Sequence, residues 1–156
     1  MRIFLVALLA FGVARGAPNV LPAPLGQVLD SASSVVLYSL EPIMQQPGMR
    51  DQLDGFDILG KVNLDREETK ICVATFEKAI ADSNGQAMDC FDPRHALRVF
   101  SDGHNYDFLL CYACDHLAVY RDGRDVGGVS VAGSPGALNH LLKKHHLPIS
   151  HSRGSR

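Results

Sequence analysis

The sequence predicts an α+β domain in which an antiparallel sheet of about five to six strands, built from hairpins, carries two main helices packed on one face. Short β-branched and aromatic runs recur along the chain, and Asp-Gly pairs separate several of them in its second half. Two other segments have helical periodicity, one in the middle of the chain and one near its C-terminus. Hairpins therefore outnumber the crossover connections that a parallel sheet requires.

The first half of the chain contains two expected strands and one expected helix. The first strand covers 33–40 and ends at Glu41-Pro42, and the second covers 56–64, after a loop over 43–55. Asp65 is the expected N-cap of a helix over 66–83, which ends at Asn84-Gly85. The periodicity of this helix places Cys72 on its apolar stripe, so we expect a buried, structural cysteine there.

The second half is predicted to be a meander followed by a helix. Ser134-Pro135 provides a helix start, and the apolar residues after it have helical spacing. Asp102-Gly103 and Asp122-Gly123 have the residue types that tight hairpin turns need. The expected strands cover 95–100, 105–111, 117–121 and 125–132.

The Asp102-Gly103 turn also predicts a register. If Ser101 pairs with His104, then His95 lies opposite Leu110 and the residues around Cys90 lie near the end of the partner strand. We therefore expect four side chains to converge at the far end of this hairpin, namely those of Cys90, His95, Cys111 and Cys114.

Outside this domain, the chain has the features of an exported protein. Arg2 precedes an apolar run, and Ala14-Arg15-Gly16 offers a cleavage site before Ala17. We therefore assign 1–16 as a signal peptide, too short to span a bilayer, and expect no membrane span after its removal. Residues 17–32 form a Pro-rich lead-in whose first part, 17–24, we exclude from the core. A single domain over 33–148 and a disordered tail over 149–156 complete the chain, and the expected location is periplasmic or secreted.

Composition narrows the function classes. The formal charge is −2, aromatic residues make up 7% and Trp is absent, so we expect no nucleic acid partner. We find no phosphate-binding glycine loop, no hydrolase elbow and no His-Glu-x-x-His motif, and we assign no catalytic residue and no cofactor-binding residue. Neither a protein partner nor a small-molecule partner is identifiable from the residues.

Three kinds of chemistry fit the cysteine cluster. The first is a structural disulfide, common in exported proteins, that joins Cys111 to Cys114 or Cys90 to either of them. The second is a zinc site formed by Cys90, His95, Cys111 and Cys114, because three thiolates and one imidazole complete a tetrahedron. The third is a redox-active Cys111/Cys114 pair that cycles between dithiol and disulfide, although no helix is expected to start at the pair and activate it. The polar neighbours that could assist are Arg94 and His116.

The motif around these cysteines carries a resemblance. The segment from Cys90 to His95 reads Cys-Phe-Asp-Pro-Arg-His, and a strand further on ends in the Cys-x-x-Cys pair of Cys111 and Cys114. This pair of motifs resembles the motifs of small exported bacterial proteins of unknown function, and the resemblance covers roughly residues 35–148. The resemblance implies that Cys90, His95, Cys111 and Cys114 form one unit, but it implies no activity.

The sequence therefore favours an exported, non-enzymatic binding or structural domain organised around a Cys/His cluster. The alternative is a thiol-dependent or zinc-dependent enzyme of the cell envelope, or a redox protein that uses the Cys-x-x-Cys pair.

Overall fold

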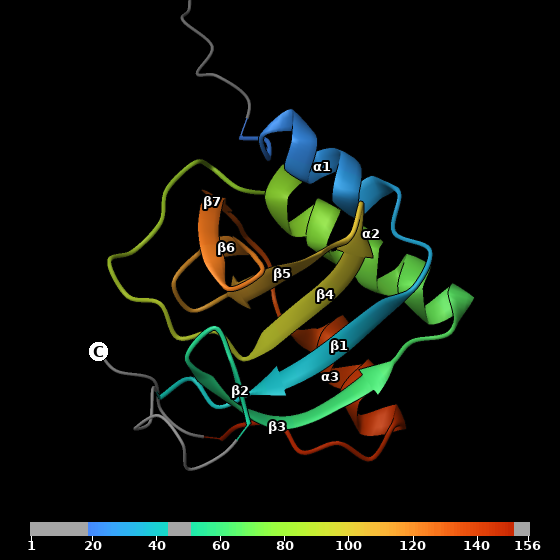
Figure 1. Cartoon of the computed structure of the whole chain (residues 1–156). Coiled ribbons are helices and arrows are strands. Elements are labelled where there is room, and N and C mark those ends of the chain that lie inside the picture. The colour runs from blue at the N-terminus through green and yellow to red at the C-terminus, as the bar shows by residue number, and fades with distance from the viewer. Residues whose placement is uncertain (1–18, 44–50, 152–156) are drawn as a thin grey trace, which may run out of the picture.

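The computed structural model describes residues 19–43 and 51–151. The expected signal peptide lies outside the described residues, as does the end of the expected tail. Three helices and seven strands follow one another in the described part of the chain (Figure 1). They are α1 (Ala23–Asp30), β1 (Val35–Leu40), β2 (Gln52–Leu53), β3 (Phe56–Asn63), α2 (Arg66–Ala81), β4 (His95–Ser101), β5 (His104–Cys111), β6 (His116–Arg121), β7 (Arg124–Ser130) and α3 (Gly136–Lys144).

The strands form one curled antiparallel sheet in the order β2-β3-β1-β4-β5-β6-β7. The predicted α+β class and the antiparallel sheet are confirmed, but the predicted strand count was too low. The additional strand, β2, lies within the expected loop over 43–55. It pairs with β3 across a tight turn at Asp54 and Gly55, whose φ values are 48° and 92°. Two paired residues are too few to give an alternating pattern that a sequence could reveal.

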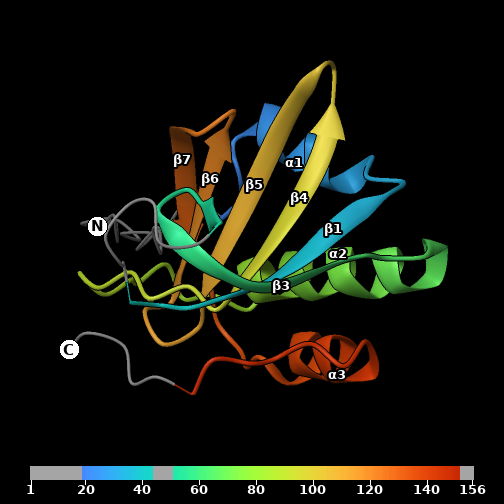
Figure 2. The same cartoon turned by 60° about the horizontal axis from the view of Figure 1, so that its bottom comes forward.

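The helices cover one face of the sheet (Figure 2). One continuous core lies between them, with Phe76 of α2, Leu138 and Leu142 of α3 and Phe108 of β5 fully buried. The opposite face holds a smaller apolar cluster inside the curl of the sheet, around Tyr38, Phe56 and Leu109. The sheet thus separates two environments, and each strand residue faces one or the other.

The lead-in and the tail contribute more to the domain than the sequence indicated. Helix α1 lies within the expected lead-in, and Leu21, Leu25 and Leu29 belong to the main core. Excluding 17–24 from the core was therefore wrong at Leu21. The side chain of Leu21 reaches a core that the composition of this segment does not reveal. In the expected tail, Ile149 packs on the same core and Ser150 is buried. Among the described residues, no helix is both long enough and apolar enough to cross a membrane.

Helix α2 begins as predicted. Asp65 is its N-cap and accepts hydrogen bonds from the backbone N–H groups of Glu67 and Glu68, while the Glu68 carboxylate accepts one from the N–H of Asp65. This reciprocal capping box satisfies N–H groups that the first helical turn cannot pair internally. The other expected boundaries differ by a few residues, as at α3, where Pro135 rather than Ser134 is the N-cap.

Glu68 also connects α2 to α3. It is 4% exposed, and its Oε1 accepts hydrogen bonds from Lys144 Nζ at 2.7 Å and from His145 Nε2 at 2.8 Å. The hydrogen bond from Lys144 is the main cause that lowers the pKa of Glu68 to about 2, and the hydrogen bonds from His145 and from the backbone of Asp65 add to it. The charged carboxylate is therefore the form that the folded protein favours.

We expect Glu68→Gln to lower the free energy of unfolding near neutral pH by on the order of 2 kcal/mol, because it removes a buried charge from three donors. The folded pKa lies below the ordinary value of 4.5, so this stabilisation is complete above about pH 4.5 and is lost as the pH falls towards 2. Urea unfolding at pH 7 and pH 3 measures both effects, and the difference between wild type and variant should shrink at pH 3. The matched control is Glu67→Gln, at a side chain that is 75% exposed, and it should change stability by less than about 0.5 kcal/mol.

Candidate functional site

The Cys-x-x-Cys pair forms a disulfide in the turn between β5 and β6. Cys111 is the last residue of β5, Cys114 lies within the turn, and their Cα atoms are 5.3 Å apart. Both are almost fully buried, at 1% and 0% exposure. Strand β6 follows the turn directly, so no helix begins at either cysteine. The pair therefore lacks the helix N-terminus that lowers the pKa of thiols in many redox proteins.

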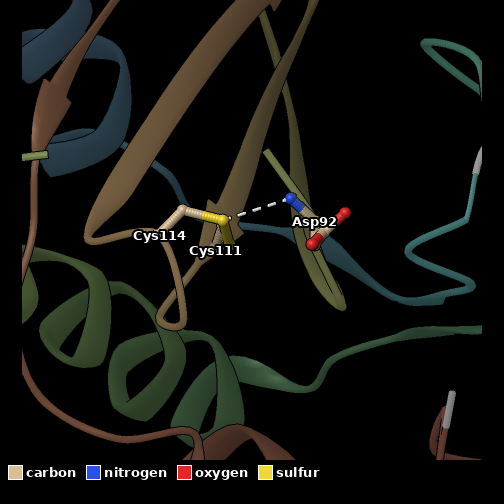
Figure 3. The surroundings of a disulfide bond; sticks show 3 residues. All are labelled: Asp92, Cys111 and Cys114. Carbon is tan, nitrogen blue, oxygen red and sulfur yellow. Dashed lines mark hydrogen bonds between the residues drawn. A yellow bond between two sulfur atoms is a disulfide. The ribbon is translucent and has the colours of Figure 1, made fainter. Parts of the chain in front are cut away.

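Two backbone hydrogen bonds attach the segment before β4 to Cys114. The N–H of Met88 donates to the carbonyl oxygen of Cys114 at 2.9 Å, and the N–H of Asp92 donates to its Sγ at 3.2 Å (Figure 3). Cys90 lies between these two contacts in the chain, and the structure places its thiol beside the same residue. An otherwise irregular segment is thus held against the disulfide.

Three potential ligand atoms meet at this point. The thiol of Cys90, a carboxylate oxygen of Asp92 and the Sγ of Cys114 all lie within 4.8 Å of one another, so the group could hold a metal ion. Cys90 is half-buried and the other two are buried. The Sγ of Cys114 is bonded to Cys111, however, and a disulfide sulfur is not a thiolate ligand. Metal binding and the disulfide therefore exclude each other.

His95 does not join the cysteines. It is 2% exposed, and its Nε2–H donates to Oδ1 of Asn139 in α3 at 2.8 Å. His95 pairs with Leu110, and neighbouring strand residues point to opposite faces, so Cys111 points away from the face that His95 shares with Leu110. The expected four-residue convergence is therefore reduced to Cys90, Cys111 and Cys114, with Asp92 in addition.

The surroundings of His95 leave little free space. A cavity of about 30 Å³ lies beside it, lined by Asp92, Leu110, Tyr112 and Pro135 among others. This volume is about that of one water molecule, too small for a substrate. Burial lowers the pKa of His95 to about 4, and the charge of Arg94 adds to the effect. A neutral, buried imidazole bonded to an amide is a structural residue here.

The other residues singled out from the sequence have separate roles. His116 lies at the start of β6 opposite Cys111, and its ring packs edge-on against Phe91 with centroids 5.3 Å apart. The carbonyl oxygen of Arg94 accepts the N–H of Leu40 at 3.0 Å and so continues the contact between β1 and β4. Cys72 is fully buried in the main core as predicted, and burial raises the pKa of its thiol to about 12.

A second polar group lies on the face of the sheet opposite the helices. Arg98 and the buried Asp107, which are cross-strand partners, form two hydrogen bonds of 2.6 and 2.7 Å, and the guanidinium lies 5.7 Å from the ring centroid of Tyr38. Partial burial raises the pKa of Asp54 to about 7, and the neighbouring Asp107 adds to this effect. Arg98 thus neutralises a carboxylate that the sheet buries, while Asp54 takes up a proton at a higher pH than an ordinary aspartate.

Sequence reasoning missed two residues of the site. Asp92 stands in the motif segment, but its carboxylate was not counted among the ligands. The predicted register does indicate its position, because it places the residues around Cys90 near the end of the partner strand. Asn139 had no signal, since its contact with His95 joins positions far apart in the chain.

Comparisons with known proteins add no assignment: no family model, no curated protein and no solved structure matches this chain.

The burial of His95 leads to a pH prediction. The pKa of His95 in the folded protein, about 4, is below the ordinary value of 6.5. The stabilisation that the neutral His95 side chain provides is therefore fully present above about pH 6.5 and is lost as the pH falls towards 4. NMR of the imidazole nitrogens should show a neutral ring at pH 5.5. His95→Gln should reduce the loss of stability between pH 6.5 and pH 4.5, because Gln does not titrate. A ring that titrates near pH 6.5 would contradict the buried environment described above.

Proposed function

We propose that the protein is an exported, non-enzymatic domain that acts through binding or as a structural component, with its cysteine cluster stabilising one end of the sheet. The single observation that carries this proposal is the burial of both sulfur-bearing residues of the Cys111–Cys114 disulfide. A catalytic pair must reach its substrate, whereas a buried disulfide in a hairpin turn restricts the unfolded chain. The signal-peptide features of the N-terminus support the oxidising compartment that such a disulfide needs.

The local structure explains what this disulfide stabilises. The turn that it closes holds the segment from Met88 to Asp92 through the two hydrogen bonds to Cys114. This segment leads directly into β4, in the middle of the sheet. A rigid turn therefore keeps the entry of a central strand in place.

Replacement of both cysteines, in Cys111→Ala/Cys114→Ala, should lower the free energy of unfolding by about 2 kcal/mol, the loop-closure value for so short a ring. The melting temperature of the oxidised protein should then fall by several degrees. The double variant prevents either sulfur from pairing with Cys90. The control Cys90→Ser should melt within about 2 °C of wild type, a shift that corresponds to less than about 0.5 kcal/mol. An unchanged melting temperature of the double variant would contradict the structural role.

A zinc site in the reduced protein is a second candidate, and the proximity of Cys90, Asp92 and Cys114 favours it. Thiolates around zinc lie about 3.8 Å apart, given Zn–S bonds of about 2.3 Å in a tetrahedron, and the observed limit of 4.8 Å is close to this spacing. Reduction of the disulfide would add Cys111 as a fourth ligand. The N–H of Asp92 already donates to one of these sulfurs, as backbone groups do around metal-bound thiolates.

The zinc hypothesis predicts that protein reduced with a phosphine and exchanged into zinc-containing buffer retains one zinc per chain after desalting. The oxidised protein should retain none, because its Cys114 is not a thiolate. Cys90→Ser should weaken zinc binding by about tenfold or more, whereas His95→Gln should leave it unchanged, since His95 contacts Asn139 instead. Elemental analysis gives the stoichiometry, and equal zinc in oxidised and reduced protein would rule out this ligand set.

A further inference from the structure

Cys90 is a free thiol placed beside a disulfide. Its sulfur lies within 4.8 Å of the Sγ of Cys114, which is bonded to Cys111. Exchange between a thiolate and a disulfide begins when the attacking sulfur reaches one of the two bonded sulfurs. Of the described thiols, Cys72 is enclosed in the core and has a raised pKa, so it is unsuited to this chemistry.

We propose that Cys90 exchanges with the disulfide, so that the protein exists as two disulfide isomers. The Cys90 thiol loses its proton to solvent, its thiolate attacks the Sγ of Cys114, and a Cys90–Cys114 bond forms. The Cys111–Cys114 bond breaks, and Cys111 leaves as a thiolate that takes up a proton. Among Cys90, Cys111 and Cys114, one disulfide and one free thiol are present before and after the step, so no external oxidant or reductant is consumed.

The backbone contacts make Cys114 the sulfur that both isomers share. The hydrogen bonds from Met88 and Asp92 hold Cys114 beside Cys90, and neither bond involves the sulfur that leaves. Cys114 therefore keeps its surroundings while its partner changes. The segment that carries Cys90 is irregular and exposed from residue 84 to residue 89, so the step disrupts no helix or strand there.

The two isomers differ in what they show to solvent. With the Cys111–Cys114 bond, the free thiol of these three cysteines is that of Cys90, which is half-buried. With the Cys90–Cys114 bond, the free thiol is Cys111, which is 1% exposed. Exchange thus moves the free thiol from a half-buried to a buried position and links the segment before β4 covalently to the turn. The longer loop closed by this second bond also restricts the unfolded chain more strongly.

The test uses the purified, oxidised protein without added oxidant. The protein is held at pH 8, quenched in acid, unfolded, labelled with N-ethylmaleimide at low pH and digested. Label at Cys90 reports the first isomer and label at Cys111 reports the second. We expect the Cys111 label in wild type to exceed that in Cys90→Ser by about tenfold or more, because this variant lacks the attacking thiol.

If the isomer with the Cys90–Cys114 bond is rare, a second variant provides an independent test. Cys111→Ser leaves Cys90 and Cys114 as neighbours, and oxidised glutathione should convert them to a mapped Cys90–Cys114 disulfide while the domain stays folded by circular dichroism. Exchange is refuted if wild type shows no Cys111 label above the Cys90→Ser control and Cys111→Ser forms no Cys90–Cys114 bond. That result leaves the structural role of Cys111–Cys114 intact. A wild-type protein without any Cys111–Cys114 disulfide would instead refute the proposed staple.

Discussion

The turn at Asp102 and Gly103 is the constraint on which the arrangement of the site depends. Both residues have positive φ, 50° and 81°, the conformation that a two-residue hairpin turn with the twist of the strands requires. It pairs Ser101 with His104 and, six residues further back, His95 with Leu110. One more residue in the turn would move every side chain of β4 to the other face of the sheet. The register therefore places Leu97 and Val99 in the core and Arg98 opposite it.

The same register separates the two parts of the motif. His95 faces the helices and is held by Asn139, whereas the cysteines belong to the turn at the end of β5. The two ends of the motif from Cys90 to His95 thus lie in different parts of the fold. Its first half contacts Cys114, and its last residue fills a buried position under α3. The register predicted from the sequence placed all four residues at one end of the hairpin and so suggested one shared site, but it did not take into account the face to which each side chain points.

Cys114 connects the elements around it. It accepts one backbone hydrogen bond at its carbonyl oxygen and one at its sulfur, is bonded to Cys111, and lies within reach of Cys90. A structural disulfide, a zinc site in the reduced state and an exchange with Cys90 all use this one sulfur. The redox state of the compartment decides between the reduced zinc site and a disulfide. The two disulfide isomers contain the same number of electrons and differ only in the sulfur to which Cys114 is bonded.

The sequence by itself determined the local features of this protein. The N-cap at Asp65, the apolar stripe with Cys72 and the register of the hairpin all follow from neighbouring residues. Only the tertiary structure decided that Leu21 joins the core, that Asn139 holds His95 and that Cys111 pairs with Cys114 while Cys90 stays free. The physical reason is range: caps, turns and periodicity are satisfied within a few residues, whereas burial and side-chain partners depend on segments that only the folded chain brings together.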